Sequence, residues 1–284
     1  MGANHASPVL PFTRAVFAIG VSLTAGTGIG LFAAPERTAD FWAWEIKAPL
    51  SAAMFGAGYI GAALSLALAL RAREWQRARV VAIVALALTS LALLATMLHL
   101  GEFALGDGGL PGAVAIIWLV VYLALPPLVL TAFVIQERAG GRREYVPGVP
   151  ALGATRLALG ATGAVLAAIG IGLLTGWAWL AAQWPWPLPA LPSAVAGAWV
   201  CTFAAGLLWF AVRERDWARV RAGVAPAIFV VVLQAIAAVR FWDRFDSDAS
   251  AAAYAVILGA LFAVLGGAAL VEERRLRESP KLGG

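Results

Sequence analysis

The chain has 284 residues, of which 62% are hydrophobic and 13% are charged, and its formal net charge is +5. Because a soluble domain carries about 25% charged residues, this composition excludes a soluble core inside a polar surface. A single cysteine, Cys201, excludes internal disulfide bonds and metal sites built from several thiolates.

Eight apolar runs are long enough to cross a bilayer, which takes about 17 to 25 residues. Their apolarity is unbroken, whereas strands of a membrane barrel alternate polar and apolar residues, so the runs predict helices. We therefore expect an all-α polytopic membrane protein with eight transmembrane helices. The expected spans are residues 14–34, 50–70, 80–100, 113–135, 156–180, 193–212, 222–240 and 250–271.

The segment RAREWQRAR at 71–79 recurs as RERDWARVR at 213–221, which is 142 residues later. From Thr13 to Phe103, 26 of 91 positions are identical at this offset, where chance would give roughly a tenth for such a composition. This self-similarity indicates a tandem duplication. The first apolar run has features of a signal peptide, but its duplicate begins in mid-chain at Arg156, so we expect a retained helix.

The duplication divides the chain into a first four-helix repeat (1–138), a linker (139–154) and a second four-helix repeat (155–284). Each repeat has an even number of helices, so both repeats enter the membrane in the same direction. We therefore expect parallel repeats related by a pseudo-twofold axis along the membrane normal.

The distribution of Lys and Arg predicts the orientation. Only four of these 21 residues, Arg37, Lys47, Arg240 and Arg244, fall on the side opposite to the termini. Because loops rich in Lys and Arg stay on the cytoplasmic side, we expect a multi-pass protein of the cytoplasmic (inner) membrane with both termini in the cytoplasm. The charges lie at the ends of apolar runs, which argues against nucleic acid as a partner of this basic chain.

The two arginine-rich segments are candidate contacts at the inner surface. Alternating arginines around a tryptophan suit an anionic leaflet, where each arginine contributes about 1 kcal/mol. Membrane lipids are the expected partners, and docking of a membrane protein or of a second copy of the chain is the alternative. The residues are Arg71, Arg73, Trp75, Arg77 and Arg79, with their duplicates Arg213, Arg215, Trp217, Arg219 and Arg221.

Two tryptophan pairs, Trp42-x-Trp44 and Trp184-x-Trp186, lie at the outer interface, before the second and sixth helices. An interfacial belt explains them most simply, since indole combines an apolar ring with an N–H donor. A belt requires a depth rather than a spacing, however, and both pairs have the same spacing. The alternative is therefore two aromatic walls that bind an amphipathic ligand.

Charged residues near the outer ends of the third and seventh helices form an outer polar cluster, which is a second candidate site. His99 and Glu102 are three residues apart, so they could share a helix face. Arg240, Asp243 and Arg244 lie at the duplicate helix end. If the repeats are related by a twofold axis, Glu102 would face Arg240 or Arg244 across it. A solvated rim of weak ion pairs is the preferred interpretation.

The middle of the fourth helix carries Pro126 and Pro127, which deprive two carbonyls of their helical hydrogen bonds. In hydrocarbon these carbonyls need other partners or a water-lined pocket, so we expect a kink near Tyr122. A hinge or ligand cavity and a static kink explain the pattern equally well. In the seventh helix, Gln234 predicts an interhelical hydrogen bond, with a ligand contact as the alternative.

The first and fifth helices are rich in glycine, which lets helix backbones approach one another closely. Gly26-xxx-Gly30 is the small-xxx-small pattern in the first helix. We expect close helix packing there rather than a ligand path along the glycines.

The sequence holds no Gly-rich phosphate loop, no HExxH and no GxSxG, and its only histidines are His5 and His99. No charged residue lies near the middle of an expected helix, which argues against an ion-driven pump. We therefore expect no catalytic or metal site and assign no cofactor. The preferred function is non-catalytic binding or passive transport of a neutral or amphipathic small molecule or lipid. The alternative is an accessory or scaffold subunit of a membrane protein complex.

Overall fold

A computed structural model of the chain describes residues 7–140 and 150–278. Over these two ranges the chain is all-α, and its extended pairings are two isolated β-bridges. Eight of the described helices are long and apolar enough to cross a membrane. The predicted all-α fold with eight helices long and apolar enough to span a membrane is therefore confirmed.

Each predicted span overlaps one long helix. The long helices are α1 (Pro11–Ala33), α3 (Pro49–Arg71), α4 (Trp75–Leu98), α5 (Gly109–Gly140), α6 (Gly153–Leu174), α8 (Ala190–Val212), α9 (Trp217–Arg240) and α10 (Asp248–Glu278). Short helical elements lie between them: η1 (Pro35–Arg37), α2 (Thr38–Phe41), η2 (Leu100–Glu102), α7 (Ala178–Ala182) and η3 (Trp242–Arg244).

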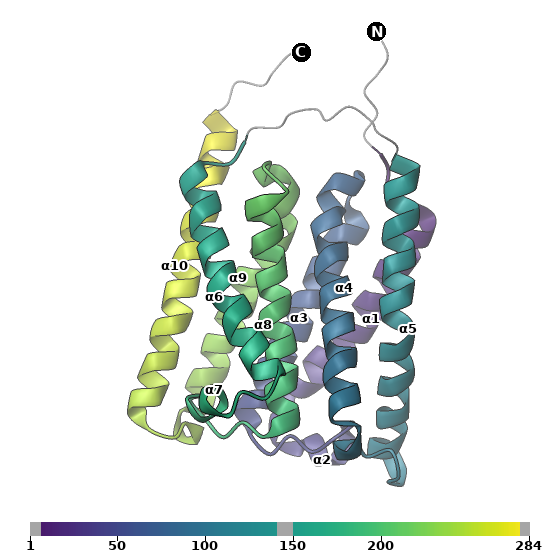
Figure 1. Cartoon of the computed structure of the whole chain (residues 1–284), viewed down its shortest axis with the longest axis vertical. Coiled ribbons are helices and arrows are strands. Elements are labelled where there is room, and N and C mark those ends of the chain that lie inside the picture. The colour runs from purple at the N-terminus through teal and green to yellow at the C-terminus, as the bar shows by residue number, and fades with distance from the viewer. Residues whose placement is uncertain (1–6, 141–149, 279–284) are drawn as a thin grey trace.

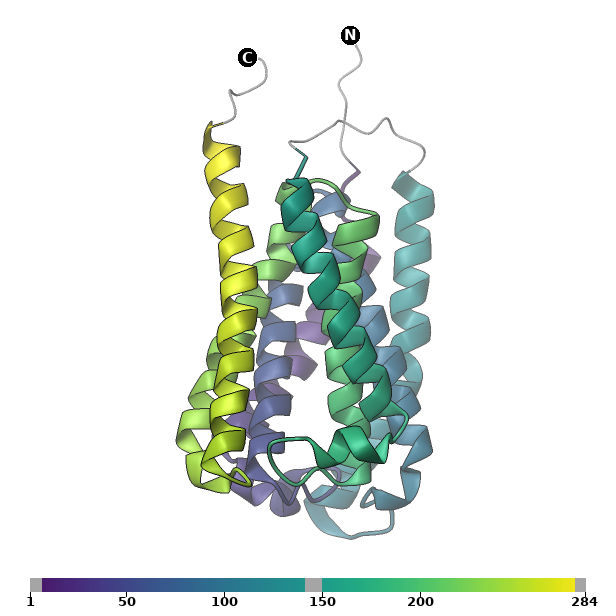
Figure 2. The same ribbon diagram turned by 60° about the vertical axis from the view of Figure 1, so that its left-hand side comes forward.

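The long helices run alongside one another in one bundle (Figures 1 and 2). At its centre α4 packs against α8, and α3 packs against α9. Around this centre α1 covers α3 and α6 covers α8, while α5 lies on α4 and α10 lies on α9. The outer helices α1, α5 and α10 are the least buried, so their apolar surfaces are available to lipid.

The two ends of the bundle differ in chemistry (Figure 1). We call one the arginine end, because it holds the arginine-rich α3–α4 and α8–α9 turns together with the start of α1 and the end of α10. We call the other the tryptophan end, because it holds the tryptophan-bearing segments 34–48 and 175–189. The arginine-rich segments and the tryptophan pairs thus lie at opposite ends of the bundle.

Helix α6 ends at Leu174, whereas the sequence predicted that the span continues to residue 180. Gly176 has a φ of +73°, a conformation that favours glycine. The Gly176 N–H donates to the Leu173 carbonyl at 3.2 Å, and the Trp177 N–H donates to the Gly172 carbonyl at 2.9 Å. These two bonds complete a Schellman motif that ends the helix, and the short α7 follows at the tryptophan end.

A glycine contact joins α1 to α3, but not through the pair that the sequence indicated. Gly26 faces open space, and Gly30 has an ordinary van der Waals distance to its neighbour. A Cβ atom on Gly28 would instead lie 2.7 Å from the Ile60 nitrogen and 3.0 Å from the Gly56 oxygen. Gly28 therefore allows the closest approach of these helices, because only it points from α1 to the α3 backbone.

A corresponding contact joins α6 to α8. A Cβ atom on Gly170 would lie 2.7 Å from the Cys201 nitrogen and 3.0 Å from the Gly197 oxygen. The α3 and α8 glycines in these contacts, Gly56 and Gly197, are 141 residues apart, one fewer than the offset of the gapless sequence match. The chain from Gly170 to Gly197 is therefore one residue shorter than the chain from Gly28 to Gly56.

Candidate functional site

The tryptophan pairs do not form the lipid-facing belt that the sequence favoured. Trp42 and Trp44 are 6% and 4% exposed, and Trp186 is 1% exposed, while Trp184 is half-buried. A belt requires indole rings on the outer surface, so this burial corrects the prediction. The rings are instead part of the protein interior at the tryptophan end.

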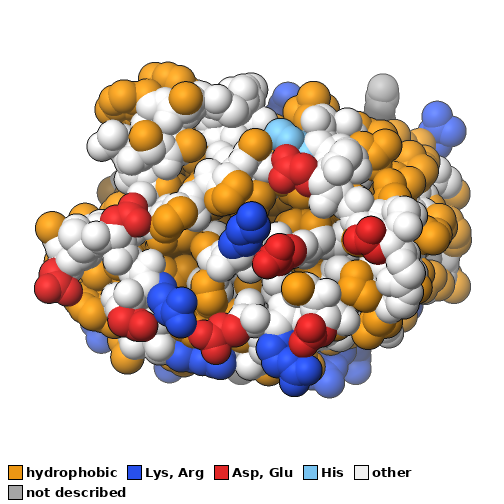
Figure 3. Space-filling model, turned by 90° about the horizontal axis from the view of Figure 1, so that it is seen from below, with side chains coloured by type: hydrophobic (Ala, Val, Ile, Leu, Met, Phe, Trp, Pro, Cys, Tyr) orange, Lys and Arg blue, Asp and Glu red, His pale blue; other side chains and the backbone are white. Residues whose placement is uncertain are grey.

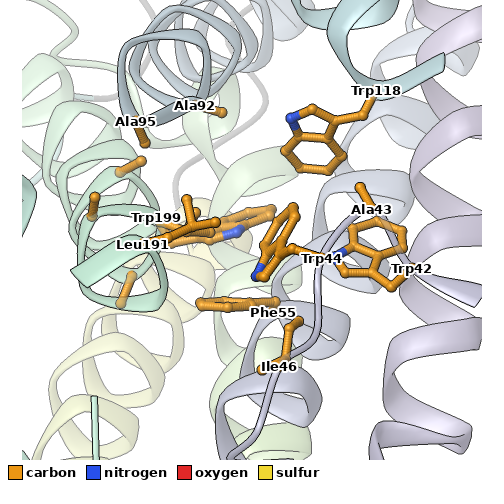
Figure 4. Packing of buried hydrophobic residues seen from close by; sticks show 14 of the residues in the cluster. Trp42, Ala43, Trp44, Ile46, Phe55, Ala92, Ala95, Trp118, Leu191 and Trp199 are labelled. Carbon is orange, nitrogen blue, oxygen red and sulfur yellow. The ribbon is translucent and has the colours of Figure 1, made fainter. Parts of the chain in front are cut away.

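Hydrogen bonds within the first loop turn its tryptophans inward. The Thr38 hydroxyl oxygen accepts a bond from the Ile46 N–H at 3.0 Å, which closes the segment that carries the pair. The Ala104 N–H donates to the Ala43 carbonyl at 2.9 Å and fixes the same segment to the chain after α4. Figure 4 shows Trp42 and Trp44 projecting from this segment into the packed interior.

The first tryptophan pair forms an aromatic cluster with Trp118 of α5 and Phe103, which we call the first aromatic cluster. The Trp118 ring lies edge-on to both rings of the pair, at centroid distances of 5.3 Å from Trp42 and 5.2 Å from Trp44. Phe103 lies 4.9 Å from Trp44. Such geometries favour contact between the positive edge of one ring and the negative face of another.

A second aromatic cluster surrounds Trp186 in the other half of the chain. Trp186 lies 5.6 Å from Phe245 and 5.2 Å from Tyr254, in both cases edge-on. Its indole N–H donates to the Ser51 hydroxyl oxygen at 2.8 Å. Since Ser51 belongs to α3, this bond joins the two halves of the chain at the tryptophan end.

Three other buried indole N–H groups have no acceptor among the described residues, and they belong to Trp42, Trp44 and Trp184. The first residues of α3 and α8 explain why the Trp186 N–H has an acceptor and the Trp44 N–H has none. The third residue of α3 is Ser51, which accepts from Trp186, whereas the third residue of α8 is Pro192, whose side chain cannot accept. A buried donor without an acceptor costs about 1–3 kcal/mol.

Tyr122, the candidate ligand contact near the prolines, has an internal partner. Its hydroxyl lies 2.6 Å from the hydroxyl of Tyr59, and both tyrosines are buried. Helix α5 is continuous through Pro126 and Pro127. The pair of hydroxyls thus joins α5 to α3, while the two hypotheses for the prolines, a hinge and a static kink, stay predictions.

Gln234 makes interhelical hydrogen bonds, which agrees with the interpretation that the sequence favoured. Its amide nitrogen donates to the Met54 carbonyl of α3 at 3.1 Å, and its amide oxygen accepts from the Tyr254 hydroxyl of α10 at 3.1 Å. The side chain therefore joins α9 to two neighbouring helices.

The outer polar cluster divides into separate contacts. His99 Nδ1 lies 3.3 Å from Glu102 Oε1, which keeps this pair on its own turn. Arg240 donates to the Phe32 carbonyl at the end of α1, at 3.1 Å, and Arg244 Nη2 lies 3.4 Å from a carboxylate oxygen of η1. Glu102 is thus paired with His99, and the alternative in which it faces Arg240 or Arg244 is not observed among the described contacts.

The carboxylate that pairs with Arg244 belongs to Glu36. Glu36 was not selected from the sequence, because the residue 142 positions later is alanine. Arg244 also pairs with its neighbour Asp243 at 3.3 Å. Figure 3 views this end of the bundle, where acidic and basic side chains are scattered among hydrophobic ones. Apart from His99, the side chains in these ion pairs are about half exposed or more. Each pair therefore contributes little to stability.

A hollow of about 280 Å³ opens between the loop before α3 and Arg244. Its lining includes Thr38 and Ile46, the two residues that close the tryptophan-bearing segment. Lys47, Glu45 and Arg244 give it a charged rim. The hollow therefore places polar surface next to the segment that holds Trp42 and Trp44.

At the arginine end, Trp75 is 3% exposed and its indole N–H donates to Glu137 Oε1 at 2.5 Å. Arg79 Nη2 pairs with the other oxygen of Glu137 at 2.6 Å. One carboxylate at the end of α5 thus receives both a tryptophan and an arginine from the start of α4.

The same arrangement recurs at the start of α9. Trp217 is 1% exposed and donates to Glu273 Oε1 at 2.9 Å, and Arg221 Nη1 lies 3.7 Å from Glu273 Oε2. The prediction that Trp75 and Trp217 contact lipid or a partner is therefore corrected, because both are enclosed by the protein. Exposed arginines of the two turns, such as Arg71 and Arg213, remain candidates for such contacts.

Two fully buried side chains at this end were not selected from the sequence. Gln136 accepts a bond from the Leu10 N–H at the start of α1 at 2.9 Å. Glu272 accepts from the Leu152 N–H at the start of α6 at 2.8 Å. The sequence signal was their matching position at the ends of the fourth and eighth apolar runs. Each supplies an acceptor for one of the unpaired N–H groups at a helix start.

A third W-x-W segment, Trp177-Ala178-Trp179, was not selected from the sequence. These two rings are 56% and 60% exposed and lie 5.3 Å apart. Trp177 directly precedes α7 at the tryptophan end, and Trp179 is the second residue of this helix. Exposed rings at a bundle end match the interfacial role that had been assigned to the other pairs.

Within the described ranges, no group of three or more His, Cys, Asp or Glu residues could hold a metal ion. His5 lies outside those ranges. Comparisons of the chain with known protein families, curated proteins and solved structures found no match. The function must therefore be argued from the site itself.

Proposed function

We propose that this chain is a non-catalytic membrane protein that binds a neutral or amphipathic small molecule or lipid at the tryptophan end. The observation that carries the proposal is the pair of buried indole N–H groups of Trp42 and Trp44, which have no acceptor among the residues that the structure describes. Buried donors are nearly always paired in proteins. A bound molecule that supplies an acceptor would satisfy them.

The chemistry of the cluster defines the ligand class. Indole is a donor only, so the ligand must offer an acceptor oxygen such as a carbonyl, ester or ether. The surroundings are aromatic, with Trp118 and Phe103 against the pair. Because an unpaired charge is costly in such surroundings, the group that enters should be neutral.

Binding is favoured over passage through the bundle. The two candidate residues inside the membrane region, Tyr122 and Gln234, have their hydrogen-bonding groups directed to Tyr59, Met54 and Tyr254. A path for a polar solute would require such groups to be free to bind it. Passive transport remains the weaker form of the proposal.

The proposed architecture is two parallel four-helix repeats related by a pseudo-twofold axis. Matching contacts in the two halves support it, since each occurs once in residues 7–140 and once in 150–278. They are the β-bridges Pro8–Glu74 and Pro150–Asp216, the bonds Trp75–Glu137 and Trp217–Glu273, and the bonds Leu10–Gln136 and Leu152–Glu272.

The proposed location is the cytoplasmic membrane, with the arginine end and both termini on the cytoplasmic side. The supporting observation is the bias of Lys and Arg, of which four out of 21 lie at the tryptophan end.

An accessory or scaffold role is the second candidate. The observation that favours it is the exposed Trp177–Trp179 pair, since paired tryptophans on a rigid turn suit a protein contact as well as a lipid interface. In that case the chain would be purified with a protein rather than with a small molecule.

Purification from the native membrane at native expression level tests the proposal. Mass spectrometry of the organic extract should show a neutral molecule with an acceptor oxygen in near-equal amount to the protein. Trp42→Phe and Trp44→Phe together keep aromatic rings but remove both donors, and should lose it. Trp179→Phe is the matched control and should retain it. Equal retention by all three proteins, or a co-purified protein with no such molecule, would contradict the proposal.

A further inference from the structure

A hollow of about 500 Å³ lies at the arginine end, between the start of α6 and the end of α8. Its floor consists of small residues, with Gly160, Ala161 and Ala164 on α6 and Ala211 on α8. Leu157, which is also in the lining, is 74% exposed. The hollow therefore opens on the outer side of the bundle, where a membrane-spanning helix meets lipid.

The hollow follows from side-chain size. At the sequence offset of the duplication, Ala161 corresponds to Ile19 in α1. The carbonyl that accepts from Arg156 is that of Ala211, and the carbonyl that accepts from Arg14 is that of Leu70. At these two positions of the lining, the first half thus has Ile19 and Leu70 where the second half has alanine, and the smaller side chains leave a groove.

The arginine at the head of this hollow is less completely bonded than its counterpart. Arg14 donates to three carbonyls, those of Val9, Leu70 and Ala72. Arg156 donates to one, that of Ala211, and its Nε is buried without an acceptor in the described chain. A guanidinium has five N–H donors in a planar fork that suits phosphate.

We propose that this hollow binds one anionic phospholipid, with its phosphate on Arg156 and the upper part of an acyl chain against the small residues of α6 and α8. Arg156 lies at the end of a membrane-spanning helix, where a phosphate headgroup would be, and the apolar floor of the hollow lies further along that helix, where an acyl chain would be. The excess of arginine at this end favours an anionic headgroup. This inference is independent of the function proposed for the tryptophan end.

Lipid binding to the detergent-purified full chain, followed by native mass spectrometry, tests the proposal. The probes are the anionic lipid phosphatidylglycerol and the lipid phosphatidylcholine, which has no net charge. The third probe is glycerophosphoglycerol, which is phosphatidylglycerol without its acyl chains. Wild type should bind phosphatidylglycerol most tightly. Arg156→Gln should weaken that binding about fivefold or more, from the contribution of one arginine at a lipid surface.

Two further variants separate a defined site from general attraction. Ala161→Ile with Ala211→Leu installs the side chains of the first half, keeps Arg156, and should weaken phosphatidylglycerol binding to a similar degree. Arg138→Gln removes one positive charge from an exposed position at the end of α5, at the same end of the bundle, and should leave binding unchanged. The melting temperature of each variant shows whether it is folded.

Four results would overturn the proposal. The first is equal weakening by Arg138→Gln, which would indicate diffuse electrostatics. The second is undiminished phosphatidylglycerol binding to the variant that carries Ala161→Ile and Ala211→Leu. Binding of glycerophosphoglycerol as tight as that of the lipid would indicate a phosphate site instead. A dimer that the same double variant disrupts, with lipid binding unchanged, would make the groove a contact between two copies through Gly160 and Ala164.

Discussion

Trp44 and Trp186 are both buried in aromatic clusters, yet only the Trp186 indole N–H has an acceptor, the Ser51 hydroxyl at 2.8 Å. Pro192 is the third residue of α8, as Ser51 is of α3, and the hydroxyl of the neighbouring Ser193 donates to the Leu173 carbonyl. The described residues therefore supply an acceptor to Trp186 and none to Trp44. This inequality between similar clusters is the basis of the proposed binding site.

The first prediction compares Trp44→Phe with Trp186→Phe in protein stripped of bound molecules. Both variants lose a similar ring volume, but only the second loses a hydrogen bond and leaves Ser51 unpaired. We expect Trp186→Phe to lower the free energy of unfolding by about 1–3 kcal/mol more than Trp44→Phe. Thermal unfolding in one detergent measures the difference, and equal losses would show that the Trp44 N–H has a protein acceptor.

The second prediction concerns the α1–α3 contact. Gly28→Ala would place a Cβ atom 2.7 Å from the Ile60 nitrogen, so we expect a loss of about 1–3 kcal/mol from overpacking. Gly26→Ala meets open space and should be neutral or slightly stabilising, since alanine favours helices over glycine. The melting temperatures of the two variants give the comparison. A larger loss for Gly26→Ala would favour the packing that the sequence indicated.

The third prediction uses the two carboxylates of the arginine end. Glu137 accepts from Trp75 at 2.5 Å and from Arg79 at 2.6 Å, whereas Arg221 lies 3.7 Å from Glu273. We expect Glu137→Gln to lower stability by about 1–3 kcal/mol, and Glu273→Gln to cost less. Added salt should reduce the difference, because part of it is electrostatic. An equal cost in both variants would mean that the shorter ion pair adds nothing.

The fourth prediction addresses the proline pair in α5. Tyr122 is fixed to Tyr59 one turn before Pro126, so we expect a static helix rather than a hinge. Spin labels on cysteines that replace the exposed Ile117 and Arg138, in a Cys201→Ala background, report the distance along α5. The distribution should be narrow and should stay narrow in Pro126→Ala, Pro127→Leu. A broad distribution that narrows on replacement would establish a hinge.

The sequence was sufficient for the number and approximate limits of the spans, because an apolar run of the required length is a local property. It did not predict the burial of Trp42 and Trp44, because that depends on the Thr38–Ile46 closure that folds the loop into the bundle. The Gly176 helix end was a local signal that the apolar run concealed.

Contacts between distant segments were not accessible from the sequence. The Ser51–Trp186 bond depends on how the halves assemble, as does the pairing of Arg244 with Glu36. Glu137 and Glu273 could have been selected, because they follow the fourth and eighth apolar runs at matching positions. Their role required the fold that brings them to Trp75 and Trp217.

The most direct test of the central claim observes the indole N–H groups of the tryptophan end. Protein labelled with ¹⁵N-tryptophan is extracted in native-lipid nanodiscs and then stripped in detergent, and its indole resonances are assigned with Trp42→Phe, Trp44→Phe and Trp186→Phe. We expect the proton signals of Trp42 and Trp44 to move upfield on stripping, as their acceptor leaves, while that of Trp186 stays in place. Signals of Trp42 and Trp44 that do not change on stripping would contradict the account.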